Sequence, residues 1–191
     1  MVCRYIIPGA DGSLEAGKVR YNWVWYFPLS SNSPEFIDIM TDTNGVLHKN
    51  TLPVGTMKPS AWKPYVSLAQ AEMCAPFAEI VSKAAQPFIT AISEAAGSRA
   101  VAMIGKVVIA GEALSLVKPF LALSTTQSAM QALLLGKVFA GEETLEGWEK
   151  KVLKTAKLNG LATNAFGGFW LHGIFNAVKW LVRYLITLVK S

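Results

Sequence analysis

The chain has 191 residues, of which 52% are hydrophobic and 16% are charged. This composition excludes a disordered protein, and the length allows one domain with a sizeable core. The formal net charge of +5 would suit nucleic acid, but the scattered basic residues form no arginine-rich cluster and no zinc-finger or RNA-binding motif, so no nucleic-acid partner is expected.

Two segments near the N-terminus predict antiparallel strands of one sheet. Residues 3–7 and 19–27 are rich in aromatic and β-branched side chains, and turn-forming residues separate them. Because side chains alternate across a strand, Trp25 should face one way and Asn22 and Tyr26 the other.

Prolines divide the middle of the chain. Between residues 28 and 64 the sequence predicts a short helix over 35–40 and a hairpin-like turn over 42–45, joined by irregular connections. From 66 to 96 the pattern is helical, and its two prolines favour two or three short helices over one long helix.

The next segment predicts two buried strands over residues 99–110, with a turn at Gly105-Lys106. A strand should then end at Gly111-Glu112-Ala113. A helix is predicted over 124–140, capped by Ser124 or Thr125, and an amphipathic helix over 145–158. The residues expected to face inward from these helices are Ala129, Leu133, Leu134, Val138, Trp148, Val152 and Leu153.

Residues 105–134 carry the pattern most suggestive of chemistry. A strand ends beside the carboxylate of Glu112, a loop with Pro119 follows, and a helix starts among small hydroxyl residues. Free backbone N–H groups at such a helix start can bind an anion or an electron-rich ring. A carboxylate at the strand end can accept hydrogen bonds from sugar-like hydroxyls, so the pattern suits a dinucleotide or a flavin.

Three short stretches of this segment resemble the second flavin-contacting motif of the class A FAD-dependent aromatic hydroxylases, in the 2,6-dihydroxypyridine 3-monooxygenase subfamily. That motif reads Gly-Asp-Ala, Arg-Pro-His and a small-residue helix start. The matching stretches here are Gly111-Glu112-Ala113, Lys118-Pro119-Phe120 and Ser124-Thr125-Thr126-Gln127. Residues 5–13 and 20–26 are similar to the strand-turn-strand pair of the subfamily's substrate domain.

The resemblance implies FAD as cofactor, oxidation of an aromatic or polyketide-like small molecule, and a place in secondary metabolism. It leaves the catalytic residues unassigned and assigns Asn22, Trp25 and Tyr26 to the substrate side, where a strand aromatic is otherwise more often core. It implies contacts with the cofactor for Gly111, Glu112, Pro119, Ser124 and Thr125.

The sequence departs from the family's motif at Glu112, Lys118 and Phe120, where the family has Asp, Arg and His. It also contains no Gly-x-Gly-x-x-Gly segment, the loop that holds the pyrophosphate in the family's flavin fold. We therefore expect a shortened, truncated family member, whose exposed flavin-domain surface a partner chain would cover. The alternatives are a flavin-free auxiliary or ligand-binding protein and an incomplete gene model.

The predicted fold class is α+β, in three parts. Residues 1–96 would be a substrate-domain-like sheet with helices, 97–160 the C-terminal part of an FAD-binding fold, and 161–191 an amphipathic or membrane-interacting helix. Two cysteines, Cys3 and Cys74, and two histidines have no metal-ligand spacing, so no metal is expected.

Residues 169–191 form an apolar helical pattern with one polar stripe. Three interpretations stay open: a helix lying on a membrane surface, a helix packed against protein, and a membrane span. Two cations in the middle make the span costly. The expected location is the cytoplasm, with a membrane-associated form as the alternative. The stripe contains His172, Asn176, Lys179, Arg183, Thr187 and Lys190, and the expected interface aromatics are Trp170, Trp180 and Tyr184.

Overall fold

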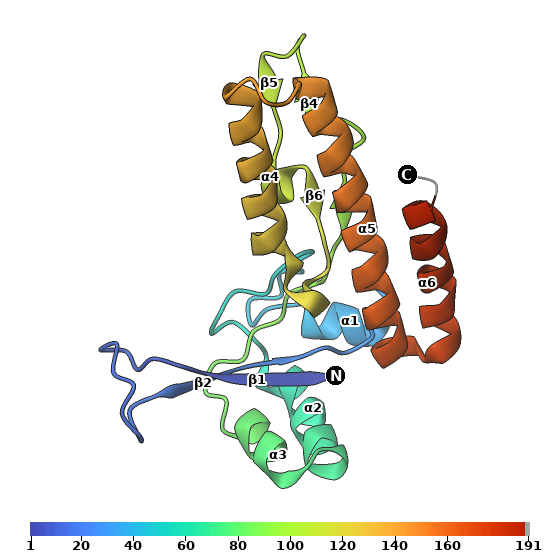
Figure 1. The fold of residues 1–191 in the computed structure, drawn as a ribbon. Helices are drawn as coiled ribbons and strands as arrows, with labels where there is room; N and C mark the ends of the chain where they lie inside the picture. Colours follow the sequence, from blue (N-terminus) through green and yellow to red (C-terminus); the bar gives the residue numbers. More distant parts are fainter. Residues whose placement is uncertain (190–191) are drawn as a thin grey trace. The chain divides into compact units, whose positions relative to one another are not determined.

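The computed structural model describes residues 1–189 and divides into two compact units (Figure 1). Unit 1 consists of Met1–Phe27 and Ser93–Ser191, and unit 2 of Pro28–Ile92. Both are described separately below. The elements are helices and small antiparallel sheets, so the predicted α+β class is confirmed. The boundary between units differs from the predicted boundary at residue 96, and the functional labels of the three predicted parts stay predictions.

Unit 1 begins with the predicted pair of strands. β1 (Val2–Ile7) pairs antiparallel with β2 (Arg20–Trp25), and Tyr5 lies opposite Asn22. The backbone N–H of Tyr26 donates to the carbonyl of Met1, which carries the pairing one residue beyond β2. The pair therefore forms as the aromatic and β-branched pattern predicts.

Two short strand pairs and two 3₁₀ turns lie between the pair of β1 and β2 and the first long helix of unit 1. β4 (Val101–Ala102) and β5 (Val107–Val108) form the predicted hairpin, but its burial was predicted wrongly. Met103 and Ile104 occupy the turn with positive φ, and 73% and 102% of their surfaces are exposed. Apolar content alone could not show that these residues form the tip of a hairpin. The other elements are β3 (Ala95–Ala96), which pairs with β6 (Ser115–Leu116), and the 3₁₀ turns η1 (Gly111–Ala113) and η2 (Pro119–Leu121).

Helix α4 (Leu123–Phe139) matches its predicted range, but its cap and its inner face differ from the prediction. Its N-cap is Ala122 in the left-handed conformation, and no side chain caps the helix. Leu133 is 75% exposed, whereas Gln127 and Gln131 are buried. Of the residues predicted to face inward, Leu134 and Val138 pack against the core, but the apolar periodicity wrongly included Leu133 and missed the two buried amides.

Helix α5 (Leu145–His172) is twice as long as predicted and ends at Gly173, where α6 (Ile174–Val189) begins. Gly173 has a positive φ of 85°, so the single helix predicted over 169–191 is broken there. Figure 1 shows α6 running back along α5, on the side away from α4. Within residues 1–189 no helix has both the length and the apolar character needed to cross a membrane.

The core of unit 1 lies between α4, α5 and the hairpin. Ala100, Leu114, Trp148 and Val152 are its buried members, so the predicted inward face of α5 is confirmed. Glu149 ties the hairpin to the helix, because its Oε1 accepts hydrogen bonds from the backbone N–H groups of Ala100 (2.7 Å) and Val101 (2.9 Å).

Unit 2 is a small helical unit with its own core. Ile39, Met40 and Ala61 are buried together, with Trp62 and Tyr65 packed against them. The pattern predicted as helical from 66 to 96 contains two helices, the first of which begins at Pro59, but the prediction was wrong for residues 83–96, which are not helical. The helices of unit 2 are α1 (Pro34–Ile39), α2 (Pro59–Glu72) and α3 (Ala75–Ser82).

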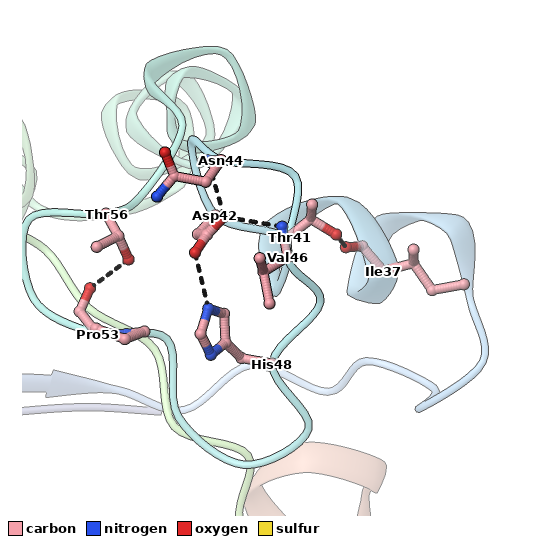
Figure 2. A network of polar contacts seen from close by, with 8 residues as sticks. All are labelled: Ile37, Thr41, Asp42, Asn44, Val46, His48, Pro53 and Thr56. Carbon is pink, nitrogen blue, oxygen red and sulfur yellow. Dashed lines mark hydrogen bonds and ion pairs between the residues drawn. The ribbon is translucent and has the colours of Figure 1, made fainter.

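The turn predicted over 42–45 is held by one buried carboxylate (Figure 2). Oδ1 of Asp42 accepts hydrogen bonds from the backbone N–H groups of Asn44 (2.8 Å) and Val46 (2.9 Å). Its Oδ2 lies 3.0 Å from Nε2 of His48, which donates because a carboxylate only accepts. These contacts, led by His48, lower the pKa of Asp42.

This lowered pKa makes the stability of unit 2 depend on pH. A carboxyl with a lowered folded pKa stabilises the fold above its unfolded pKa, about 4, and loses that contribution as pH falls through the folded value. We expect Asp42→Asn to lower the melting temperature at pH 6, and the difference from the wild type to shrink as pH falls below about 4. Thermal unfolding followed by circular dichroism measures both, and a difference that is constant with pH would contradict the assignment.

Candidate functional site

The candidate site is built on the segment between β5 and α4, which contains η1, β6 and η2. Gly111 starts η1 with a positive φ of 66°. Its backbone N–H donates to Oε1 of Gln131 (2.6 Å), and a Cβ at this position would lie 3.2 Å from Oγ of Ser128. Both the conformation and the close approach to α4 therefore favour glycine.

Two buried amides of α4 hold this loop in place. Nε2 of Gln127 donates to the carbonyl of Ser115 (3.0 Å), and Oε1 of Gln127 accepts from Nδ2 of Asn159 (2.9 Å). Gln131 accepts from Gly111, and its own Nε2 has no hydrogen-bond partner within residues 1–189. The sequence prediction missed the support given by Gln131 and Asn159. The available signal was the spacing of four residues between the glutamines, which places both on one helical face.

Glu112 lies in the first turn of η1 and is exposed. It does not cap that turn, whose N-cap is Ala110 without a side-chain hydrogen bond. In the part of the chain that the structure describes, no hydrogen bond or ion pair to its carboxylate is found. The carboxylate is therefore free to accept hydrogen bonds from a ligand's hydroxyls.

The start of α4 also presents backbone groups. Because Ala122 caps the helix without a side-chain hydrogen bond, the N–H groups of its first turn are not used by a cap. Ser124 does not cap the helix; its carbonyl accepts from Oγ of Ser128 (2.9 Å). Thr125 is exposed beside it. The absence of a capping hydroxyl leaves this helix start suited to an electron-rich group.

Lys118, which stands where the family has arginine, has partners within unit 1. Its Nζ donates to Oδ1 of Asn164 (2.7 Å) and lies 3.7 Å from Oε1 of Glu94. Nδ2 of Asn164 in turn donates to Oε2 of Glu94 (2.8 Å). This triad joins the segment before β3 to the loop before η2 and to α5, and it compensates the charge of Lys118 locally.

Phe120, which stands where the family has histidine, joins the motif loop to the strand pair. Its ring meets the ring of Tyr26 edge to face, with the centroids 5.0 Å apart. On another side it packs so closely on Gly167 of α5 that a Cβ there would overlap the ring. Burial, followed by the nearby Cys3 and Tyr5, raises the pKa of Tyr26, so its hydroxyl stays protonated at neutral pH.

The remaining candidates on β2 divide between the two faces of the strand. The side chain of Asn22 donates to the hydroxyl of Tyr5, on the face shared with Tyr26. Trp25 lies on the opposite face, where its ring meets that of Phe27 at 5.5 Å. Asn22 and Tyr26 therefore lie on the same face, about 13 Å apart along the strand, whereas Trp25 lies on the other face.

Comparison with known proteins supports the resemblance to FAD-dependent aromatic hydroxylases. A family model described as FAD binding domain-like matches residues 1–94. The chain is 25% identical over 154 residues to the 2,6-dihydroxypyridine 3-monooxygenase of Paenarthrobacter nicotinovorans, over 78% of this chain and 37% of that protein. The structure of 2,6-dihydroxypyridine-3-hydroxylase from Arthrobacter nicotinovorans matches 90% of this chain and 43% of its own, with a TM-score of 0.76 and 24% identity.

These matches confirm the resemblance to FAD-dependent hydroxylases predicted from the motifs, and FAD as the cofactor that the resemblance implies. The chain is FAD-dependent-monooxygenase-like and spans less than half the length of either relative. The contacts assigned to single residues stay predictions, and the activity of the whole relative enters only as a proposal.

Proposed function

We propose that this chain, which resembles FAD-dependent hydroxylases, supplies the substrate-side strands and one wall of the flavin site in a monooxygenase that hydroxylates an aromatic small molecule. The observation that carries the proposal is the contact between Tyr26 and Phe120. It brings the strand pair of the substrate side to the loop of the flavin motif within one compact unit. The resemblance predicted both segments independently, and their junction is the place where a substrate would meet a flavin.

The residues of the motif loop suit the ring and ribityl parts of FAD. The free carboxylate of Glu112 would accept hydrogen bonds from ribityl hydroxyls, and the extra methylene relative to aspartate lengthens its reach. The loop from Gly111 to Pro119 and the N–H groups at Ser124 and Thr125 would face the ring system. When bound, FAD would supply the activation of oxygen, and this chain would bind and orient the reactants.

Tyr26 and Asn22 are the groups proposed to orient the aromatic substrate. The hydroxyl of Tyr26 would act as a hydrogen-bond donor to an oxygen substituent of the substrate. Asn22 lies on the same strand face and offers both a donor and an acceptor. The proposal that the substrate is aromatic or polyketide-like, and that it belongs to secondary metabolism, rests on the family resemblance alone.

Flavin binding tests this proposal directly. Because the site residues match the ribityl and ring contacts and the sequence has no Gly-x-Gly-x-x-Gly loop, riboflavin and FAD should bind this chain with similar affinity. Quenching of flavin fluorescence on titration measures both. We expect Glu112→Ala to weaken binding of either flavin about tenfold, a loss of about 1.4 kcal/mol in line with a charge-assisted hydrogen bond.

Glu146→Ala is the matched control, since Glu146 is an exposed carboxylate in the first turn of α5. It should leave both affinities unchanged. A much tighter affinity for FAD than for riboflavin would show a phosphate site outside the motif loop and contradict the expected similarity. If neither flavin binds, the proposed wall does not recognise flavin in this chain.

A flavin-free binding protein is the second candidate, and the triad around Lys118 favours it. The cation that would meet the cofactor in the family is here engaged by Glu94 and Asn164. The strand face with Asn22 and Tyr26 would then hold an aromatic ligand without flavin. A ligand that shifts the fluorescence of the wild type and not of Tyr26→Phe, with no flavin bound, would favour this candidate.

A further inference from the structure

Helix α6 packs on α5 with its more polar side. Trp180 donates from Nε1 to Oδ1 of Asn176 (3.1 Å), and a Cβ at Gly168 of α5 would lie 2.7 Å from the same Oδ1, so the helices approach closely there. Part of the predicted polar stripe thus faces protein rather than solvent. Lys190 of that stripe lies outside the described residues. The half-buried residues of α6 are Asn176, Ala177, Trp180, Tyr184 and Thr187.

The opposite side of α6 is apolar and exposed. Phe175 is 90% exposed, and the aliphatic residues that follow recur every three or four positions, so they form one continuous face. A helix of a globular protein usually buries such a face. The exposed members, here called the outer face, are Ile174, Phe175, Val178, Leu181, Val182, Leu185, Ile186, Leu188 and Val189.

The charges around the outer face have one sign. Residues 150–191 contain no Asp or Glu. Lys179 and Arg183 are exposed at the border between the outer face and the side that meets α5. Both cations also lie over the ring of Trp180, at 5.6 and 5.0 Å from its centroid. The surface therefore combines aliphatic side chains with a cationic edge and no competing acid.

We propose that the outer face of α6 binds an anionic lipid surface, with the helix lying in the plane of the membrane. The aliphatic side chains would enter the acyl boundary while Lys179 and Arg183 contact the headgroups. Exposed Phe169 and Trp170 at the end of α5 lie close to the turn at Gly173 and suit the headgroup level. Of the aromatics expected at the interface, Trp180 and Tyr184 are half-buried against α5 instead.

Charge favours lipid over a second copy of this chain as the occupant. Two outer faces packed together would bring the cations of both copies to one seam, and residues 150–191 offer no acid to pair with them. An anionic membrane satisfies both the apolar face and the cationic edge. The inference does not depend on the proposed flavin site, which lies in the loop before α4.

Flotation of the whole chain with lipid vesicles tests the proposal. We expect binding to phosphatidylcholine vesicles with 30% phosphatidylserine to be at least tenfold tighter than to pure phosphatidylcholine, and to weaken as salt is raised. Leu181→Ser with Leu185→Ser should reduce binding to the anionic vesicles at least tenfold. Lys179→Glu with Arg183→Glu should remove the preference for phosphatidylserine.

Two pairs of substitutions on α4 and the hairpin serve as controls for these changes on α6. Leu133→Ser with Phe139→Ser removes two exposed apolar side chains, and Lys106→Glu with Lys137→Glu reverses two exposed cations; neither pair should alter binding. Circular dichroism and riboflavin affinity should be the same in all variants. The proposal would be overturned if the chain bound no vesicles or bound both kinds equally. It would also be overturned if the chain bound no vesicles but formed a dimer that Leu181→Ser with Leu185→Ser dissociates.

Discussion

Replacing Trp148 with alanine should lower the free energy of unfolding of this chain by about 3–5 kcal/mol. This side chain of α5 is fully buried in the core that it shares with Leu114 and with residues of α4, so its removal leaves a large cavity in unit 1. The change also leaves the carbonyl of Gln131 without the hydrogen bond from the indole Nε1 (3.0 Å). Chemical denaturation followed by circular dichroism measures the loss.

Trp170→Ala is the control, because that side chain lies on the same helix and is 55% exposed. It should change the free energy of unfolding by less than about 1 kcal/mol. Trp148→Phe should cost less than Trp148→Ala, since it keeps an aromatic ring in the core and loses the indole hydrogen bond with a smaller part of the buried volume. Equal losses for the changes at positions 148 and 170 would contradict the placement of the core.

Local patterns predicted the elements of this fold better than their burial. The pair of β1 and β2, the turn at Asp42 and the inward face of α5 follow from alternation, turn residues and helical spacing. Met103 and Ile104 were expected inside because they are apolar, yet the tight hairpin turn exposes them. Sequence patterns report spacing along the chain, whereas burial depends on which segments fold over it.

The candidate site shows the same limit at Gln127 and Gln131. Amides on a helix ordinarily indicate its solvent face, and apolar spacing placed Leu133 inside without pointing to the glutamines. The structure reverses this because the loop from Gly111 to Ser115 has backbone groups that need partners, and the amides supply them. Such a requirement becomes visible only when loop and helix are seen together.

Two of the three departures from the family's motif, Lys118 and Phe120, are matched by other residues of this chain. Lys118 cannot form the planar two-pronged contact of arginine, and Asn164 with Glu94 holds its single ammonium group instead. Phe120 lost the hydrogen bonding of histidine, and Gly167 leaves the space in which its ring packs. Lys118 and Phe120 thus each have a partner on α5, which indicates a loop adapted to this chain rather than a decayed one, whereas the third departure, Glu112, is exposed without such a partner.

Gly167→Ala tests that adaptation most directly. In a helix interior this change ordinarily stabilises by up to about 1 kcal/mol. Here the added Cβ would overlap the ring of Phe120, which Tyr26 holds from another side. We expect a net loss of about 1–2 kcal/mol in the free energy of unfolding, as overpacking outweighs helix propensity. Gly160→Ala on the same helix, where a Cβ meets nothing within 4 Å, should stabilise instead.

A double-mutant cycle isolates the contact between these two residues. In a Phe120→Ala background the overlap is gone, so Gly167→Ala should become neutral or stabilising, a coupling of at least about 1 kcal/mol. Denaturant unfolding of the four proteins gives the coupling energy. If Gly167→Ala costs the same with and without the Phe120 ring, the loop does not rest on α5 at this point. The placement of Phe120 between α5 and Tyr26 would then be unsupported. The proposed junction of the flavin and substrate sites would be unsupported as well.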